Sequence, residues 1–321
     1  MRTAHLGRTQ VTVTALGFGA APIGNLYRAT DEATARAAVD AAWDHGVRYF
    51  DTAPHYGLGL SELRLGRALA ERPRDQFTVS TKIGRVLVPN PAPTGSDLAA
   101  GGFAVPDELT RVHDYSRDGV RRSLDASLER LGLDRIDIVY VHDPDDHMDA
   151  AIHQAIPALV ELREQGVIGA IGAGMNTVDP LRRFVAESDV DVVMVAGRWT
   201  LLDRSAVPLL TECNQWGVSV VAAAPFNSGL LARPYPPDDA YFDYGPAPAP
   251  VLDQARTLAR VCTEHGTTLP HAAMRFPLIS RTVAAVVAGP RSAEQAAQNA
   301  AWVAKAVPAT LWPALEAARS G

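Results

Sequence analysis

Three ionisable side chains lie at the ends of segments that are otherwise apolar and rich in β-branched residues. They are Asp51, Lys82 and His142, and the run before His142 (residues 136–141) is apolar at nearly every position. Packing explains the apolar residues of a buried strand, but it does not explain a charge where the strand ends. A carboxylate, an ammonium and an imidazole at neighbouring strand ends could bind a polar substrate and move a proton.

Tyr56 is the candidate for the group that gives or takes that proton. Asp51 and Lys82 are expected on adjacent strands, where a carboxylate and an ammonium that are costly to bury separately can pair. Tyr56 follows Asp51 by five residues, so the chain can turn back and place the ring over the pair. A nearby ammonium favours the phenolate, and we therefore expect the pKa of Tyr56 to fall from about 10 towards neutrality.

The elements that must hold these residues alternate along the chain between β-branched segments and amphipathic segments of helical spacing. Strand alternating with helix predicts right-handed βαβ units and a parallel sheet. Eight strands without a break in composition predict an α/β fold, a (β/α)8 TIM barrel that uses residues 1–321 as a single domain. The predicted strands are Ala15–Phe18, Val47–Thr52, Phe77–Lys82, Ile136–His142, Ile168–Ala173, Val190–Val195, Val218–Ala223 and Thr282–Ala288.

The remaining segments fit that barrel. Arg2–Leu6 and Gln10–Val13 predict an N-terminal β-hairpin. Two long connections, residues 84–115 and 226–250, follow strands, so we expect them on the C-terminal face, where barrel enzymes hold their sites. The alternative is a doubly wound sheet with a GxGxxG loop, but Pro22 stands where the last glycine would be and no helix follows directly.

The composition is that of an ordinary globular protein, with 321 residues, 47% hydrophobic side chains and a net charge of −6. The mild acidity disfavours a nucleic-acid partner, and no apolar run approaches the ~18 residues of a membrane span. The N-terminal residues carry no apolar signal-peptide core. Cys213 and Cys262 lack metal-type spacing and fit a reducing compartment. We therefore expect a cytoplasmic protein with a small-molecule partner.

Longer motifs around the four candidate residues resemble the aldo-keto reductase family. They are VRYFDTAPHYG at 47–57, SELRLG at 61–66, VSTK at 79–82, LDASLERLGLD at 124–134 and VH at 141–142. The resemblance covers the whole chain, with the motifs in the family's order. It implies a (β/α)8 barrel that binds an extended nicotinamide dinucleotide without a Rossmann fold. It also implies a catalytic tetrad of Asp51, Tyr56, Lys82 and His142.

The resemblance implies reversible hydride transfer between the nicotinamide and a carbonyl or hydroxyl carbon. In reduction Tyr56 would protonate the developing alkoxide and His142 would polarise the oxygen, while Lys82 and Asp51 set the pKa of the tyrosine. Three further segments, 169–176, 196–202 and 224–231, are most similar to the branch of L-fucose and D-threo-aldose 1-dehydrogenases and pyridoxal 4-dehydrogenase. We expect an NAD(P)-dependent oxidoreductase that oxidises an aldose to a lactone; pyridoxal oxidation or general aldehyde and ketone reduction is the alternative.

The family pattern also assigns contacts with the cofactor and the substrate. Asn176 would bind the nicotinamide amide, Trp199 would stack on the ring, and Asp51 would lie beside it. Further positions would hold the pyrophosphate and the adenosine: Pro225, Phe226, Asn227, Ser228, Gly229, Leu230, Gly289, Arg291, Gln295, Gln298 and Asn299. The substrate walls would come from Tyr27, His55 and Trp199.

The chain departs from the commoner family pattern at three of these positions. Met175 replaces a serine and Ala196 a glutamine, which leaves more of the nicotinamide's orientation to Asn176 and Trp199. Gln295 replaces an arginine that in many members binds the adenosine 2′-phosphate. We therefore expect activity with either NAD or NADP and a modest preference for NAD.

Three other functions remain open from the residues. The run from His142 to His147, with His153 beyond it, could be a metal site, but barrel metal sites draw ligands from several strand ends. We expect no metal. Lys82 could form a Schiff base in an aldolase-type barrel. The chain could also be a regulatory subunit that binds the cofactor without catalysis, although an intact tetrad disfavours that interpretation.

Overall fold

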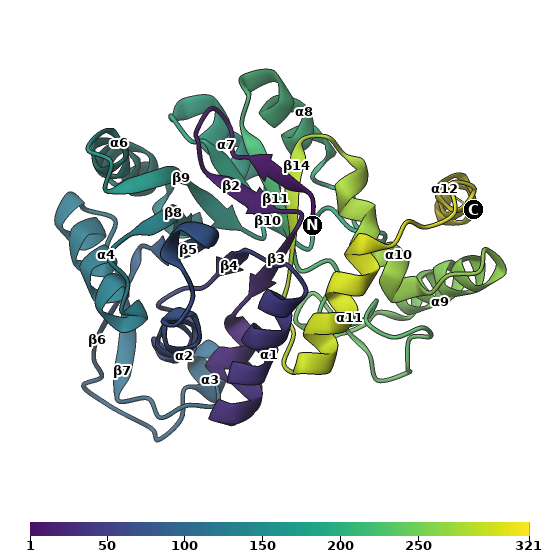
Figure 1. Ribbon diagram of the computed structural model, residues 1–321, viewed down its shortest axis with the longest axis horizontal. Coiled ribbons are helices and arrows are strands. Elements are labelled where there is room, and N and C mark those ends of the chain that lie inside the picture. Colours follow the sequence, from purple (N-terminus) through teal and green to yellow (C-terminus); the bar gives the residue numbers. More distant parts are fainter. Residues whose placement is uncertain (321) are drawn as a thin grey trace.

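The computed structural model describes residues 1–320, which form a closed barrel of eight parallel strands surrounded by helices (Figure 1). The barrel strands are β3 (Leu16–Gly19), β4 (Tyr49–Asp51), β5 (Thr78–Ile83), β8 (Ile136–His142), β9 (Ile168–Met175), β10 (Val192–Ala196), β11 (Ser219–Ala223) and β14 (Val283–Ala288). The last strand, β14, pairs in parallel with the first, β3, and so closes the ring. The predicted (β/α)8 barrel is confirmed, and each predicted strand ends within two residues of the observed one.

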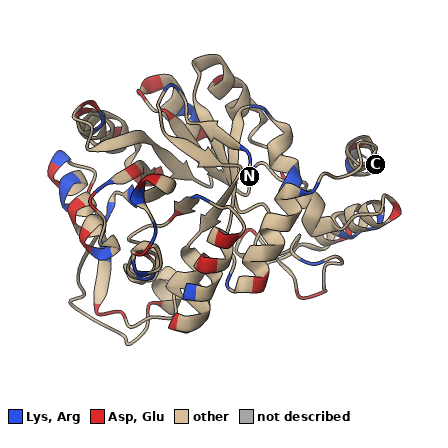
Figure 2. Ribbon diagram, viewed as in Figure 1, with Lys and Arg blue, Asp and Glu red and all other residues tan. Residues whose placement is uncertain are grey.

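Helices connect successive strands and cover the outside of the barrel. Those that follow the strands are α1 (Glu32–Asp44), α2 (Leu60–Leu69), α4 (Arg117–Leu131), α6 (Ile156–Glu164), α7 (Val178–Glu187), α8 (Val207–Trp216), α10 (Leu269–Arg275) and α11 (Ala293–Ala304). Two further helices, α9 (Ala249–Glu264) and α12 (Leu311–Ser320), pack together on one flank of the barrel (Figure 1). Basic and acidic residues are interspersed along the outer helices (Figure 2). Among residues 1–320, no helix is long and apolar enough to cross a membrane.

The predicted N-terminal hairpin is present, and it closes the N-terminal end of the barrel. Its strands, β1 (Thr3–His5) and β2 (Thr12–Thr14), are antiparallel. Leu6 and Val13 of this hairpin join a cluster of buried side chains inside the barrel that includes Tyr49 and Tyr140. A separate and larger apolar layer lies between the strands and the surrounding helices. The barrel is therefore packed and closed at its N-terminal end, which leaves its C-terminal end to hold a site.

The two long connections contain structure that the sequence did not predict. Residues 84–115 form an antiparallel hairpin of β6 (Arg85–Pro89) and β7 (Leu109–His113), with the short helix α3 (Leu98–Gly101) between its strands. The second connection forms the two-residue strands β12 (Tyr241–Phe242) and β13 (Gly245–Pro246). Both connections follow barrel strands, β5 and β11, and so start from the C-terminal face. Short helix α5 (Met148–Ala150) follows β8 in the same way.

Gly66 is the residue that lets α2 pack closely on the end of α4. A Cβ atom at this position would lie 2.1 Å from the carbonyl oxygen of Leu131, far inside van der Waals contact. Alanine is the better helix former, but here it would push the two helices apart, so we expect Gly66→Ala to lower the free energy of unfolding by about 1–3 kcal/mol. Denaturant unfolding measures this. Leu63→Ala, on the exposed face of α2, is the control, and an unchanged stability of Gly66→Ala would contradict the packing argument.

Candidate active site

The structure brings together the four residues of the expected tetrad at the C-terminal end of the barrel. Asp51 ends β4, Lys82 lies near the end of β5, and His142 ends β8. Lys82 Nζ donates hydrogen bonds to Asp51 Oδ1 at 2.9 Å, to Asp51 Oδ2 at 2.8 Å and to the Thr52 carbonyl at 2.9 Å. The same ammonium lies 4.7 Å from the centre of the Tyr56 ring. The Tyr56 and His142 rings are nearly perpendicular, with centroids 5.8 Å apart.

Local structure fixes Tyr56 in this position. A small apolar cluster that includes Leu58, Phe103 and Val105 packs against its ring. The chain then turns sharply at Gly57, which has a φ of +64°. A Cβ there would lie 2.2 Å from the Gly24 carbonyl oxygen, so the turn that follows Tyr56 requires glycine.

The buried charge pair next to Tyr56 is tightly held. Asp51 and Lys82 are only 3% and 2% exposed, and the Ser80 hydroxyl donates a third hydrogen bond to Asp51, at 2.7 Å. Burial lowers the pKa of Lys82, but the charges of Asp51 and Tyr56 and the hydrogen bonds with both residues together outweigh burial, and the net pKa is raised. Lys82 is therefore a permanent ammonium rather than a neutral amine.

The expected direction of the pKa shift of Tyr56 is wrong for this structure. Burial raises the pKa of Tyr56, and the charge and hydrogen bonding of Lys82, which lower it, do not outweigh burial. The nearby negative charge of Asp51 also raises this pKa, and so it partly cancels the effect of the Lys82 ammonium on Tyr56. The Tyr56 hydroxyl is consequently protonated at neutral pH.

His142 is neutral in this environment. Burial and the charge of Arg85 hold the pKa of His142 well below its ordinary value. Its Nε2 atom lies 3.4 Å from a carboxylate oxygen of Asp143, the next residue along the chain. A carboxylate beside Nε2 favours the tautomer in which that nitrogen carries the proton. The imidazole can then donate a hydrogen bond to a substrate oxygen without carrying a charge.

The rings around the tetrad form the wall of a candidate substrate site. His55 packs against His142 and Phe103, with ring centroids 5.6 and 5.3 Å apart. Burial and the charge of Arg111 lower the pKa of His55 to about 2, so this ring is neutral as well. Tyr27 is 55% exposed, and its backbone N–H donates to the Gly102 carbonyl at 2.7 Å. Phe103 was missed in the sequence because the long connection that carries it has no periodic pattern.

Trp199 lies elsewhere on the rim. Its ring packs against Phe276, with centroids 4.8 Å apart, and its indole N–H donates to the Pro277 carbonyl at 3.2 Å. Among the described residues, Trp199 therefore makes its aromatic contact with Phe276. The rings in contact with Tyr56 are those of His55, Phe103 and His142. The expected stacking of Trp199 on a nicotinamide stays a prediction.

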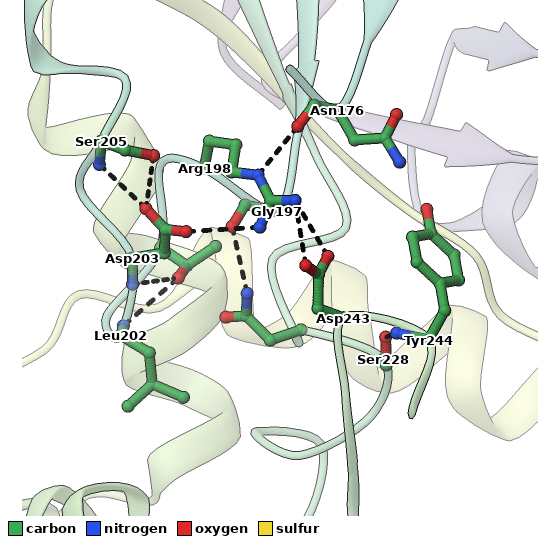
Figure 3. Close-up of polar contacts among 11 residues, drawn as sticks. Asn176, Gly197, Arg198, Leu202, Asp203, Ser205, Ser228, Asp243 and Tyr244 are labelled. Carbon is green, nitrogen blue, oxygen red and sulfur yellow. Dashed lines mark hydrogen bonds and ion pairs between the residues drawn. The ribbon is translucent and has the colours of Figure 1, made fainter. Parts of the chain in front are cut away.

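Arg198 connects three segments at the strand ends (Figure 3). Its Nε donates to the Asn176 carbonyl at 2.8 Å, and its guanidinium donates to both carboxylate oxygens of Asp243 at 2.9 and 3.2 Å. Asp243 and Tyr244 form the turn between β12 and β13, where the Tyr244 N–H donates to Ser228 Oγ at 3.0 Å. The tip of the second long connection is therefore fastened over the ends of β9, β10 and β11.

The loop after β11 fits the expected contact with a dinucleotide. Ala224, Asn227, Ser228 and Gly229 all have positive φ angles, which is unusual for three residues with side chains. The Asn227 amide nitrogen donates to the Gly197 carbonyl at 3.1 Å, while its oxygen is buried without a partner in the described structure. An unsatisfied buried oxygen beside a strained loop is typical of a ligand site. In this loop Ser228 and Gly229 are exposed, Phe226 is partly buried, and Pro225 and Leu230 are buried.

The segment expected to hold the adenosine lies at the N-terminus of α11. Ser292 caps this helix by accepting a hydrogen bond from the Gln295 N–H, and the Gln295 side chain accepts one from the Arg291 N–H at 2.8 Å. The Arg291 guanidinium is turned towards residues 22–30 and donates to the Leu26 carbonyl. It is therefore already engaged with the protein. Of the other expected positions, Gly289 and Gln298 are exposed and Asn299 is buried.

The N-terminal face of the barrel, opposite the tetrad, carries a cavity lined by paired charges. The cavity has a volume of about 860 Å³ and opens between the N-terminal hairpin and the starts of four strands. Its charges pair with one another, as Arg163 does with Asp189 and Asp191. Within the described part of the chain, no group of three or more His, Cys, Asp or Glu side chains could hold a metal ion.

Comparison with known proteins agrees with this geometry. The sequence pattern of the aldo/keto reductase family matches residues 15–319. The chain belongs to the aldo/keto reductase family. It is 49% identical over 313 residues to the D-threo-aldose 1-dehydrogenase of a Pseudomonas species, a match that covers 96% of this chain and 95% of that protein. It is 40% identical over 328 residues to the pyridoxal 4-dehydrogenase of Microbacterium luteolum, with 97% and 95% coverage.

A solved structure extends this relation to the fold. The holo form of the aldo-keto reductase AKR11C1 from Bacillus halodurans superposes with a TM-score of 0.78 at 27% identity, and covers 99% of this chain and 96% of that one. The protein described here is thus an aldo-keto reductase and an oxidoreductase, as its motifs predicted. Members of this family use NAD(P)H.

Proposed function

We propose that this aldo-keto reductase is an NAD(P)-dependent aldose 1-dehydrogenase, which oxidises the anomeric carbon of a cyclic aldose to a lactone. The observation that supports it most is the convergence of the Tyr56 hydroxyl, the buried Lys82–Asp51 pair and the neutral His142 at one end of the barrel. The similarity to a D-threo-aldose 1-dehydrogenase over nearly the whole of both chains supports an aldose as substrate.

Each residue has a defined task in this proposal. When bound, the nicotinamide supplies or accepts the hydride. Tyr56 removes the proton of the anomeric hydroxyl during oxidation and returns it during reduction, and Lys82 stabilises the phenolate that forms. Asp51 keeps Lys82 in place through two hydrogen bonds. His142 donates a hydrogen bond to the same substrate oxygen and so orients it between the two rings.

The cofactor would be held by the segments described above. Asn176 is the candidate contact for the nicotinamide amide, the loop 225–230 for the pyrophosphate, and the start of α11 for the adenosine. The unpaired Asn227 oxygen and the capped N-terminus of α11 support these assignments. A small-molecule sugar or aldehyde remains the proposed partner.

Pyridoxal oxidation is the second candidate, because a pyridoxal 4-dehydrogenase is 40% identical over 97% of this chain. A Schiff-base reaction at Lys82 is disfavoured, since it needs a neutral amine and the charge of Asp51 raises the pKa of Lys82. An initial-rate screen of aldoses and pyridoxal, each with NAD and with NADP, tests the proposal. Turnover of pyridoxal without turnover of any aldose would overturn it.

The preference between NAD and NADP depends on the start of α11. The Arg291 guanidinium is turned towards residues 22–30 and donates to the Leu26 carbonyl, so it is poorly placed to bind a 2′-phosphate. We expect Gln295→Arg to shift the ratio of NADP to NAD affinity by about one to two orders of magnitude, because a charge-assisted contact contributes roughly 1.5–3 kcal/mol. Competition binding of both nucleotides measures the shift.

Ala301→Arg is the control for that experiment, because it adds the same charge at an exposed position farther along α11. It should leave the ratio unchanged. A wild-type preference for NADP of more than a hundredfold would contradict the expectation, since Arg291 would then suffice for the phosphate.

A further inference from the structure

Asp143 is a carboxylate beside the tetrad that the proposed chemistry does not use. It follows His142 at the end of β8, and its backbone N–H donates to the Gly174 carbonyl at 3.1 Å. Its φ angle is +40°, a conformation that residues with side chains rarely adopt but that Asp and Asn tolerate best. Such a conformation at a strand end often marks a side chain that is held in place for function.

The carboxylate of Asp143 points towards the reacting groups. One of its oxygens, Oδ2, lies 3.4 Å from His142 Nε2 and accepts a hydrogen bond from Arg85 at 3.0 Å. Its charge is also close enough to raise the pKa of Tyr56 and of Tyr244. The side chain is 26% exposed, and within residues 1–320 its other oxygen, Oδ1, has no hydrogen-bond partner.

Arg85 forms an ion pair with this carboxylate and favours its charged form, although burial outweighs that effect and the net pKa of Asp143 is raised. Burial raises the pKa of Asp143, and the positive charges of Arg85 and Lys82 oppose that effect, while Asp145 adds to it. Arg85 begins strand β6, so the ion pair also joins the hairpin of the first long connection to the end of β8. The hairpin therefore brings a fixed positive charge to the carboxylate rather than to the substrate oxygen.

We propose that Asp143 determines substrate specificity by accepting a hydrogen bond from the hydroxyl group on the carbon next to the reacting carbon. This inference rests on the proposed function, because it takes an aldose as the substrate. The reacting oxygen must lie within hydrogen-bond distance of both Tyr56 and His142 Nε2. Because Asp143 Oδ2 is 3.4 Å from that nitrogen, a hydroxyl adjacent to the reacting oxygen falls within reach of the carboxylate.

A carboxylate at this place selects by chemistry as well as by shape. An ionised carboxylate only accepts hydrogen bonds, so it favours a hydroxyl donor and disfavours a carbonyl or an apolar group at the same position. A substrate without that hydroxyl leaves the Oδ1 atom of this carboxylate without a hydrogen-bond partner beside the bound ligand, which is the arrangement that discriminates between a ligand and its deoxy analogue. Asp143 thus favours α-hydroxy substrates such as aldoses over simple aldehydes.

The test pairs a change in the protein with a change in the substrate. The variants are Asp143→Asn and, as a control, Asp146→Asn, which removes the same charge from an exposed position in the same loop. The substrates are the aldose that the wild type oxidises best and its 2-deoxy counterpart. Asparagine tolerates the backbone conformation of residue 143, and the midpoint of thermal unfolding checks that the variant is folded.

We expect the wild type to prefer the aldose over its 2-deoxy counterpart by about 10- to 100-fold in kcat/KM, the range of one charge-assisted hydrogen bond. Asp143→Asn should lose most of that preference through a lower kcat/KM for the aldose alone, and Asp146→Asn should keep it. A parallel loss on both substrates, or an unchanged preference, would overturn the inference, because Asp143 would then only anchor Arg85. A wild type that oxidises neither sugar would instead overturn the proposed function, and the inference with it.

Discussion

Replacing Tyr56 by phenylalanine is expected to lower kcat for oxidation and for reduction by about 10²- to 10⁴-fold, the usual contribution of a positioned acid or base. The change removes the hydroxyl and keeps the ring that packs against Phe103 and His142. Dissociation constants for NAD and NADP should therefore stay close to those of the wild type. Steady-state rates in both directions and nucleotide titrations measure the two effects separately.

The pH dependence of the wild type provides a second measurement of the same group. Because burial raises the pKa of Tyr56, the hydroxyl is protonated at neutral pH. Oxidation needs the phenolate, so its rate should rise with pH towards that pKa; reduction needs the hydroxyl, so its rate should fall over the same range. Tyr235→Phe, which removes an exposed phenol, is the control variant. A Tyr56→Phe enzyme that retains most of its turnover, or an oxidation rate that falls as pH rises, would end the assignment.

Replacing Lys82 by arginine is expected to abolish nearly all activity, with a loss of at least about 10²-fold in kcat, although the charge is conserved. The compact ammonium donates hydrogen bonds to both carboxylate oxygens of Asp51 and to the Thr52 carbonyl while its Nζ lies 4.7 Å from the centre of the Tyr56 ring. A planar guanidinium is larger and cannot form that arrangement at a position where the native lysine is only 2% exposed. The Tyr56 phenolate would then lack a positive charge in the position that the Lys82 ammonium occupies.

Lys305→Arg is the matched control, because Lys305 is the other lysine of the chain and is exposed at the end of α11. It should behave as the wild type does. Good activity in Lys82→Arg would reduce Lys82 to a counter-ion of Asp51. Borohydride trapping of a substrate adduct on Lys82 would instead support the aldolase reaction.

The barrel and the meeting of the four tetrad residues could be predicted because both follow from short-range patterns. Parallel strands buried on both faces are nearly continuous apolar runs, so Asp51, Lys82 and His142 are recognisable as exceptions at the ends of three of them. Closure of the barrel brings neighbouring strand ends together, which is why residues far apart in the sequence meet. Tyr56 could be added because it follows Asp51 by only five residues.

The features that escaped prediction depend on the balance of opposing effects or on long-range contacts. The direction of the pKa shift of Tyr56 was wrong because the sequence shows the ammonium of Lys82 but not the depth of burial. The ion pair of Arg198 with Asp243 joins two connections whose paths have no periodic signal. The same holds for Arg85 and Asp143, which only the β6–β7 hairpin brings together.

The way the barrel closes has a consequence for how the polypeptide is made. Leu16 of β3 pairs with Val286 of β14, so the first barrel strand to leave the ribosome must wait for the last before its second edge is paired. Until then the nascent chain has two open strand edges, of the kind that recruit other strands and lead to aggregation. Contacts between such distant parts of a sequence also form slowly. During synthesis the surrounding helices must therefore shield the edges of a sheet that only the final eighth of the chain can close.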